Sequence, residues 1–377
     1  MDPVARRIRE LPPYLFAELD RKKKAMRAAG ADLIDLGIGD PDLPTPPHVV
    51  AALREAAGKA AYHRYPAYEG MRAFRETVAR FMERRFGVRL DPDREVVALI
   101  GSKEGIAHLP LALVDPGDEV LCPDPGYPVY ASGTRFAGGV VRSLPLRRED
   151  GFVPDLPDKG AKLVWVNFPN NPTAATVTLD FYRRLAGWAR STGTIVASDL
   201  AYSEMVFEGE PARSFLEVGA DVGIEFHSLS KTFNMTGWRI GWACGRADLV
   251  AALSSVKTNV DSGPFEAVQE AAIAAIDGDP ACVARMRDVY RERRDALCDG
   301  LLALGHDVIR PRATFYVLCA CPSGLGSVAF TARLLEGAHV VATPAVGFGA
   351  GGEGFVRFAL TQPVERIRQA VERIARL

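Results

Sequence analysis

The fold is decided by residues 163–199, LVWVNFPNNPTAATVTLDFYRRLAGWARSTGTIVASD. The apolar run 163–167 and the β-rich run 194–199 have the composition of buried strands, and residues 178–191 between them have the length and periodicity of a helix. Short strands that alternate with helices predict a mostly parallel sheet with helices on both faces. The stretch therefore indicates an α/β fold.

The same alternation continues on both sides of this stretch and completes the sheet. Further strands are expected at 96–100, 119–122, 139–144, 224–228 and 240–244, and further helices at 103–114 and 127–136. With 163–167 and 194–199 these runs predict a mostly parallel seven-stranded sheet between helices.

The two ends of the chain have a different organisation. Helices are expected at 14–29, 47–60, 70–86, 247–257, 264–304 (broken at Gly278 and Pro280), 327–336 and 363–376, and strands near 307–310, 315–320 and 355–360. A proline-rich stretch at 40–47 marks a boundary. We predict an N-terminal arm with part of a small domain at 1–45, a large cofactor-binding domain at 46–265 and a small C-terminal domain at 266–377. The small α/β domain is therefore expected to be formed by residues from both ends of the chain.

The composition is that of an ordinary globular protein. Of 377 residues, 48% are hydrophobic and 25% charged, which argues against intrinsic disorder, and the net charge of −1 offers no basic excess for nucleic acid. No apolar run reaches the ~18 residues of a membrane span, and the charged N-terminus does not resemble a secretory signal. The six cysteines match neither a disulfide framework nor a zinc motif. We expect a cytoplasmic protein without a metal, a membrane or a nucleic-acid partner.

Lysine is rare in this chain, which makes each lysine informative. Only nine of the 46 basic residues are lysines. Lys231 follows the strand 224–228 among small and apolar residues, where partial desolvation lowers the pKa of an amine and makes it a nucleophile. Ser228, Ser230 and Arg239 lie close to it in the sequence and supply donors for a phosphate.

Polar residues also follow other strands of the expected sheet, where ligands of open α/β sheets bind. Gly101-Ser102-Lys103-Glu104-Gly105 opens a helix, and its glycines and helix N-terminus suit an anion, although a simple capped turn fits equally well. Asp199 ends an apolar strand, either as a structural cap or as the partner of a cation. Arg357 lies within an apolar strand, either as a carboxylate clamp or as an edge-strand arginine.

One cofactor requires all of these parts together. Pyridoxal 5'-phosphate (PLP) needs a lysine for its Schiff base, a carboxylate beside its pyridine nitrogen and a phosphate cradle with an arginine. Each residue alone is a weak signal, but the set, placed at strand ends of one sheet, favours PLP. The glycine-containing stretch 101–105 matches neither the P-loop pattern nor the dinucleotide-binding glycine pattern.

These motifs resemble those of the class I and II aminotransferases of fold type I. The resemblance is carried by Tyr65-Pro66-Ala67-Tyr68-Glu69-Gly70, Asn171-Pro172-Thr173, Asp199-Leu200-Ala201-Tyr202, and Ser228-Leu229-Ser230-Lys231 followed by Arg239. It extends from about residue 10 to the end of the chain. It implies a PLP-dependent transferase that exchanges an amino group between amino acids and 2-oxo acids.

The resemblance also implies a role for each matching residue. Lys231 would form the Schiff base and move the proton, and Asp199 would keep the pyridine nitrogen protonated. Asn171 and Tyr202 would bind the phenolate oxygen, and Tyr127 would stack on the ring. Phosphate ligands would be Ser102, Lys103, Ser228, Ser230 and Arg239. Arg357 would bind the substrate α-carboxylate beside Gly39, and Tyr65 would reach the phosphate of a neighbouring subunit, which implies a homodimer.

Within the family, the chain is most similar to the LL-diaminopimelate aminotransferase branch. The stretches 101–110, 124–130, 223–232 and 257–263 carry this likeness. In that branch, residues matching Tyr14, Lys103 and Asn259 contribute to the substrate pocket, and residues matching Tyr127 and Asn171 face it as well. A substrate with a second carboxylate and a distal ammonium suits such polar residues.

One departure from the family pattern concerns the loop after Asn171-Pro172-Thr173. Most members continue with glycine, whereas this chain has Ala174, which adopts a positive φ only at a cost. Several functions remain open at this point. They are aspartate, alanine or N-succinyl-diaminopimelate transamination, a PLP-dependent C–S β-lyase reaction, a regulatory module that binds PLP without turnover, and a nicotinamide dehydrogenase.

Overall fold

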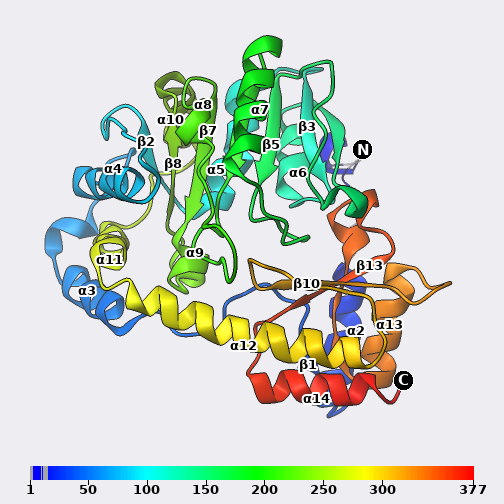
Figure 1. Ribbon diagram of the computed structural model, residues 1–377. Coiled ribbons are helices and arrows are strands. Elements are labelled where there is room, and N and C mark those ends of the chain that lie inside the picture. Colours follow the sequence, from blue (N-terminus) through cyan, green and yellow to red (C-terminus); the bar gives the residue numbers. More distant parts are fainter. Residues whose placement is uncertain (1–2, 10, 12–15) are drawn as a thin grey trace.

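The computed structural model describes residues 3–9, 11 and 16–377. A seven-stranded sheet forms its larger part, with the strand order β2-β8-β7-β6-β5-β3-β4 (Figure 1). These strands are β2 (Val96–Leu99), β3 (Glu119–Asp124), β4 (Val140–Pro145), β5 (Leu163–Asn167), β6 (Ile195–Asp199), β7 (Gly223–Ser228) and β8 (Gly241–Gly245). Only β8 runs antiparallel to its neighbours in this sheet. All seven strands predicted from the sequence are therefore present, and the α/β fold class is confirmed.

Helices cover both faces of this sheet. Successive side chains of each strand point to opposite faces, so neighbouring strand residues pack against different helices. Val97 and Leu99 belong to an apolar cluster with helices α5 (Ser102–Leu113), α6 (Val129–Phe136) and α10 (Ala247–Val260). Val96 and Ala98 belong to the cluster that includes α4 (Arg72–Phe86) and α7 (Leu179–Thr192). The sheet is therefore buried on both sides, as its strand composition predicts.

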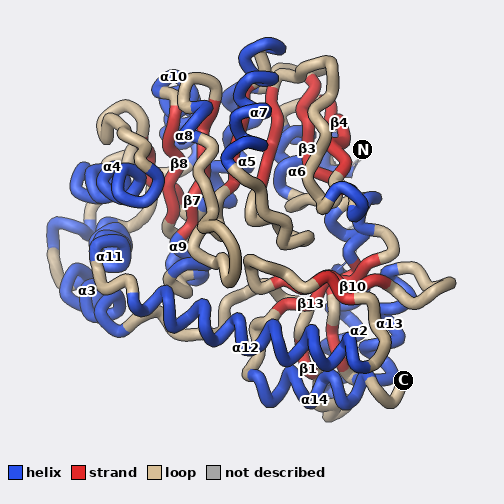
Figure 2. The backbone as a smooth tube through the Cα atoms, viewed as in Figure 1, coloured by secondary structure: helices blue, strands red, loops and turns tan. Residues whose placement is uncertain are grey.

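A second sheet lies beyond the carboxyl ends of the parallel strands, as Figure 2 shows by the two separate groups of strands. It consists of β12 (Thr343–Pro344), β13 (Phe355–Ala359), β10 (Tyr316–Ala320) and β9 (Val308–Ile309), in that order and antiparallel. Nearby, β1 (Ile34–Asp35) pairs in parallel with β11 (Val340–Val341), which joins the N-terminal and C-terminal parts of the chain. The short strands β1, β11 and β12 were not predicted, because two-residue pairings leave no periodicity in the sequence.

The remaining helices lie around these sheets. They are α1 (Arg6–Arg9), α2 (Phe16–Ala28), α3 (Pro47–Ala57), α8 (Leu216–Gly219), α9 (Leu229–Thr232), α11 (Glu266–Asp277), α12 (Ala281–Ala303), α13 (Ser327–Ala338) and α14 (Val364–Ile374). The break between α11 and α12 falls at 278–280, as predicted. The domain limits 1–45, 46–265 and 266–377 stay a prediction, and α11 packs against α3 and α4 at the start of the larger part (Figure 1). Among the helices described, none is long and apolar enough to cross a membrane.

Ala174 adopts the left-handed conformation that its position in the loop demands. Its φ is +59°, its side chain is buried, and its N–H donates to the carbonyl of Asn170 at 2.9 Å. We therefore expect Ala174→Gly to raise the free energy of unfolding by about 1 kcal/mol, measured by urea denaturation. Ala175, whose φ is not positive, is the matched control, and Ala175→Gly should lower stability by about 0.5–1 kcal/mol. Equal effects of the two changes would contradict this explanation.

Candidate active site

A cavity of about 460 Å³ lies where the parallel strands end. It gathers eleven of the residues predicted from the sequence: Gly39, Ser102, Lys103, Tyr127, Asn171, Asp199, Tyr202, Ser228, Ser230, Lys231 and Arg239. Asn167, Ala201, Thr236 and Tyr316 also line it and were not predicted. Strand ends that are distant in sequence meet here, which explains why the separate motifs form one site.

Lys231 lies in the short helix α9, directly after strand β7. The Ser228 side chain caps this helix by accepting a hydrogen bond from the Ser230 N–H. Lys231 Nζ donates to the Gly39 carbonyl at 3.1 Å and lies 5.6 Å from the centre of the Phe315 ring. Burial in this setting lowers the pKa of Lys231 to about 8. At pH 7 about a tenth of the amine is therefore unprotonated and available as a nucleophile.

Asp199 is a buried carboxylate at the end of β6. It accepts hydrogen bonds from the Tyr130 hydroxyl at 2.7 Å and from the Ala201 N–H at 3.3 Å. Burial nevertheless raises its pKa to about 6, because these two donors offset the desolvation only in part. Within the described part of the chain, no lysine or arginine forms an ion pair with Asp199. The site therefore suits a ligand that brings a cationic N–H to this carboxylate.

The turn between β2 and α5 forms a cradle for an anion. Gly101 has a φ of +72°, and a Cβ atom there would lie 2.2 Å from Arg239 Nη2. Arg239 donates from Nη1 to the Thr236 carbonyl at 2.7 Å and from Nη2 to the Ile100 carbonyl at 3.3 Å. The guanidinium group is thereby held against the N-terminus of α5, where Ser102 and the helix dipole favour a phosphate.

Arg357 is a buried cation on the inner strand β13. Its Nη1 donates to Asn171 Oδ1 at 2.8 Å and its Nη2 to the Gly37 carbonyl at 2.9 Å, while its Nε has no hydrogen-bond partner among the described residues. The guanidinium carbon lies over the rings of Tyr316 and Phe348, 4.2 and 4.6 Å from their centres. The edge-strand interpretation of Arg357 is therefore wrong, since β13 lies between β12 and β10. In the described part of the chain no carboxylate pairs with this buried guanidinium, which therefore suits a carboxylate ligand.

Tyr316 joins the second sheet to the cavity and was not found from the sequence. Its hydroxyl lies 3.1 Å from the hydroxyl of Tyr202. A Cβ atom on Gly39 would lie only 2.2 Å from the Tyr316 oxygen, so a side chain at position 39 would displace this tyrosine. No local motif marks Tyr316, because its role depends on a contact between distant segments.

Arg357, Tyr65 and Asn259 are not among the residues that line the cavity. Tyr65 is 89% exposed, and Asn259 is exposed on α10, where its Nδ2 donates to the Ser255 carbonyl at 2.8 Å. Tyr14 lies outside the described residues. The roles predicted for these residues in binding therefore stay predictions.

Comparison with known proteins identifies the family. Residues 31–374 match the family described as aminotransferase class I and II. The chain belongs to this family and is an aminotransferase. The LL-diaminopimelate aminotransferase of Syntrophobacter fumaroxidans is 52% identical over 99% of this chain and 98% of its own length. The enzyme of the same name from Aquifex aeolicus is 53% identical, over 98% of each chain.

Solved structures agree with this assignment. Substrate-bound BacF from Bacillus subtilis has a TM-score of 0.95 at 37% identity and covers 100% of this chain and 98% of its own. Aspartate aminotransferase from Thermus thermophilus with maleate has a TM-score of 0.93 at 34% identity, with 100% of both chains covered. The chain therefore has the fold of PLP-dependent transferases of type I, and the dehydrogenase alternative is excluded.

Proposed function

We propose that this chain is a PLP-dependent LL-diaminopimelate:2-oxoglutarate aminotransferase. The observation that carries the proposal is the cavity that brings Lys231, Asp199 and the anion cradle together. Relatives that share about half of their residues with this chain over nearly its whole length carry the name LL-diaminopimelate aminotransferase. The substrates would be amino acids and 2-oxo acids, exchanged in two half-reactions.

The residues present fit PLP. Lys231 would hold the cofactor, Asp199 would accept a hydrogen bond from its ring nitrogen, and the turn with Ser102 and Arg239 would bind its phosphate. The raised pKa of Asp199 supports this placement, because a protonated ring nitrogen supplies the cation that the carboxylate lacks in the protein alone. When bound, PLP acts as an electron sink that weakens the bonds at the substrate α-carbon.

The protein side chains would orient the substrate and move its proton. Arg357 would bind the α-carboxylate, since it is a buried cation that donates to Asn171, a residue of the cavity lining. That clamp fixes the α-carbon near Lys231 Nζ, which in its neutral form accepts the α-proton and then returns it. Tyr202, hydrogen-bonded to Tyr316, would hold the oxygen of the ring. Lys103, which lines the cavity, would bind the distal carboxylate of a long dicarboxylate substrate.

The proposal is tested by the absorbance of the purified protein with PLP, followed by addition of LL-diaminopimelate. We expect the band of lysine-bound PLP to convert to that of pyridoxamine phosphate, and 2-oxoglutarate to restore it. A response to glutamate but not to LL-diaminopimelate would keep transamination and reject the substrate. Release of pyruvate from cysteine conjugates without a 2-oxo acceptor would indicate a β-lyase instead.

We also propose a homodimer in which Tyr65 completes the site of the neighbouring subunit. Tyr65, Tyr68, Val260 and Phe265 are large apolar side chains that are 89%, 48%, 60% and 42% exposed. Their two segments are adjacent, because a Cβ atom on Gly263 would lie 3.5 Å from the Ala67 carbonyl oxygen. Such an exposed apolar group favours burial against a second copy.

Mixing two inactive variants tests the shared site. Lys231→Ala and Tyr65→Ala homodimers should each have low activity, and a hybrid dimer contains one site with both native residues. Random exchange of equal amounts should therefore restore about a quarter of the wild-type activity, since half of the dimers are hybrids with one native site each. No recovery after exchange, with hybrids verified by mass spectrometry, would show that Tyr65 serves its own subunit or none.

A cytoplasmic location is part of the same proposal. All six cysteines are free thiols. Free thiols in this number are typical of a reducing compartment.

A further inference from the structure

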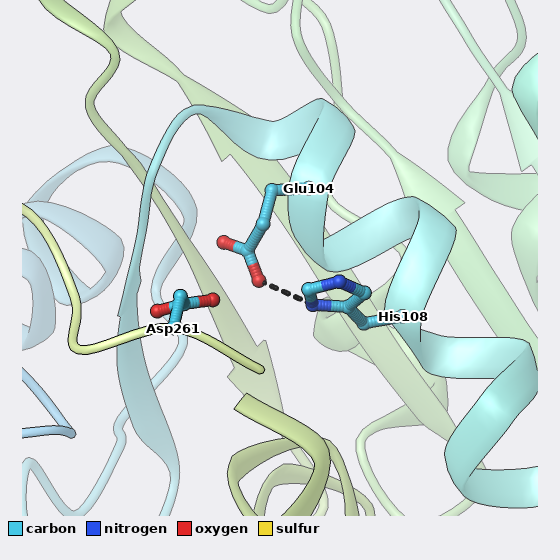
Figure 3. A group of neighbouring side chains, drawn as sticks. All are labelled: Glu104, His108 and Asp261. Carbon is cyan, nitrogen blue, oxygen red and sulfur yellow. Dashed lines mark hydrogen bonds and ion pairs between the residues drawn. The ribbon is translucent and has the colours of Figure 1, made fainter. Parts of the chain in front are cut away.

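A cluster of three potential metal ligands lies beside the anion cradle. Glu104 and His108 lie one turn apart on α5, and Asp261 follows α10 and faces them (Figure 3). One ligand atom of each lies within 4.8 Å of the others, and His108 Nδ1 lies 2.8 Å from Glu104 Oε1. By residue type alone, the cluster resembles a cation site.

The Lys257 ammonium contacts both carboxylates of this cluster. Its Nζ donates to Glu104 Oε2 at 2.9 Å and to the two oxygens of Asp261 at 3.1 and 3.2 Å. The Lys257 side chain is 2% exposed. A metal ion would have to displace this buried ammonium. Lys257 therefore supplies the positive charge that balances the two carboxylates of the cluster.

Glu104 connects this cluster to the cradle. Its Oε2 also accepts a hydrogen bond from the Ile100 N–H at 3.0 Å. The Ile100 carbonyl accepts from Arg239 Nη2 at 3.3 Å, so both backbone polar groups of Ile100 are held. The turn that leads into Ser102 and Lys103 is therefore fixed from one side by Glu104 and from the other by Arg239.

The position of Glu104 creates an electrostatic conflict that Lys257 resolves. A carboxylate in the first turn of α5 stabilises the helix N-terminus, but it repels a phosphate bound at the same terminus. Asp261 adds a second negative charge to the cluster. With the Lys257 ammonium between them, the two carboxylates keep their hydrogen bonds while their repulsion of an anion is reduced.

We propose that Lys257 is a positioning residue for the anion cradle: it neutralises Glu104 and holds the turn before Ser102 in the form that binds the phosphate of PLP. This inference rests on the proposed function, since it requires that the cradle binds PLP. Lys257 itself does not line the cavity, and it acts through Glu104.

The dissociation constants of PLP and of pyridoxal, measured by fluorescence titration of the apoprotein, test the proposal. Lys257→Met, which keeps the length but removes the charge, should weaken PLP binding about tenfold and pyridoxal binding much less, because only PLP carries the phosphate. Adding Glu104→Gln should recover most of the affinity, since the glutamine oxygen still accepts from Ile100. Lys159→Met, at an exposed lysine paired with Glu119, is the control and should bind PLP normally.

Several results would overturn the proposal. These are unchanged PLP affinity in Lys257→Met, equal weakening for PLP and pyridoxal, or no recovery in the double variant. If Lys257→Met does not fold, Lys257→Gln removes the same charge while keeping a donor, and normal PLP affinity in that variant would be equally decisive. Wild-type protein that binds no PLP would instead refute the proposed function, so the two failures are distinguishable.

Discussion

Lys231→Ala is expected to abolish transamination, lowering kcat by about 10⁴-fold or more, because the variant loses both the nucleophile and the proton carrier. The geometry of the cavity supports this dependence of the activity on Lys231. Lys231 Nζ is the amine that lines the cavity with a pKa lowered to about 8, and it is held there by the Gly39 carbonyl. The measurement is formation of glutamate from 2-oxoglutarate and LL-diaminopimelate, together with the absorbance of bound PLP.

Lys231→Arg is the matched variant that separates charge from nucleophilicity. Arginine keeps a positive charge in the cavity but stays protonated, so it neither bonds to the cofactor nor accepts a proton. We therefore expect Lys231→Arg to be as inactive as Lys231→Ala and to lack the band of lysine-bound PLP. Activity within tenfold of wild type in either variant would refute the role of Lys231.

The sequence predicted the sheet and most of the cavity because both depend on local signals. Strands 163–167 and 195–199 are marked by their own composition, and Asp199 and Lys231 are marked by their places after apolar strands. Tyr316 was missed because it reaches the cavity from another sheet, through its contact with Tyr202. Such a contact leaves no trace in the neighbouring residues.

The difference between local signals and contacts in space also explains why the roles of some residues stay predictions. Tyr65 and Asn259 were assigned to the site by family resemblance, and in the single chain both are exposed. The wrong alternative for Arg357 has a related cause, because the sequence does not tell an edge strand from an inner one. Burial and pairing of a strand depend on its neighbours in space.

Asp199→Asn is expected to lower kcat by about 10³-fold while stabilising the apoprotein. The amide keeps the shape of the side chain but carries no charge, so it does not hold a proton on the ring nitrogen of PLP. Asp124 ends strand β3 outside the cavity lining and provides the matched control. Asp124→Asn should leave kcat within about twofold of wild type.

The stability gain follows from the raised pKa of Asp199, about 6 in the folded apoprotein against an ordinary value of 3.8. Ionising this carboxylate costs more in the folded than in the unfolded state, so the fold loses stability as the pH rises from about 4 through 6. Above pH 7 the loss amounts to about 3 kcal/mol, at about 1.4 kcal/mol per pKa unit. Asp199→Asn removes this loss of stability. Urea unfolding of the apoproteins should therefore show a larger gain in the free energy of unfolding at pH 8 and a smaller one at pH 5.

An equal gain at the two pH values would contradict the charge argument, because only the ionisation of Asp199 depends on pH. Low activity together with a pH-dependent gain would show that the ionised carboxylate that catalysis needs also destabilises the apoprotein.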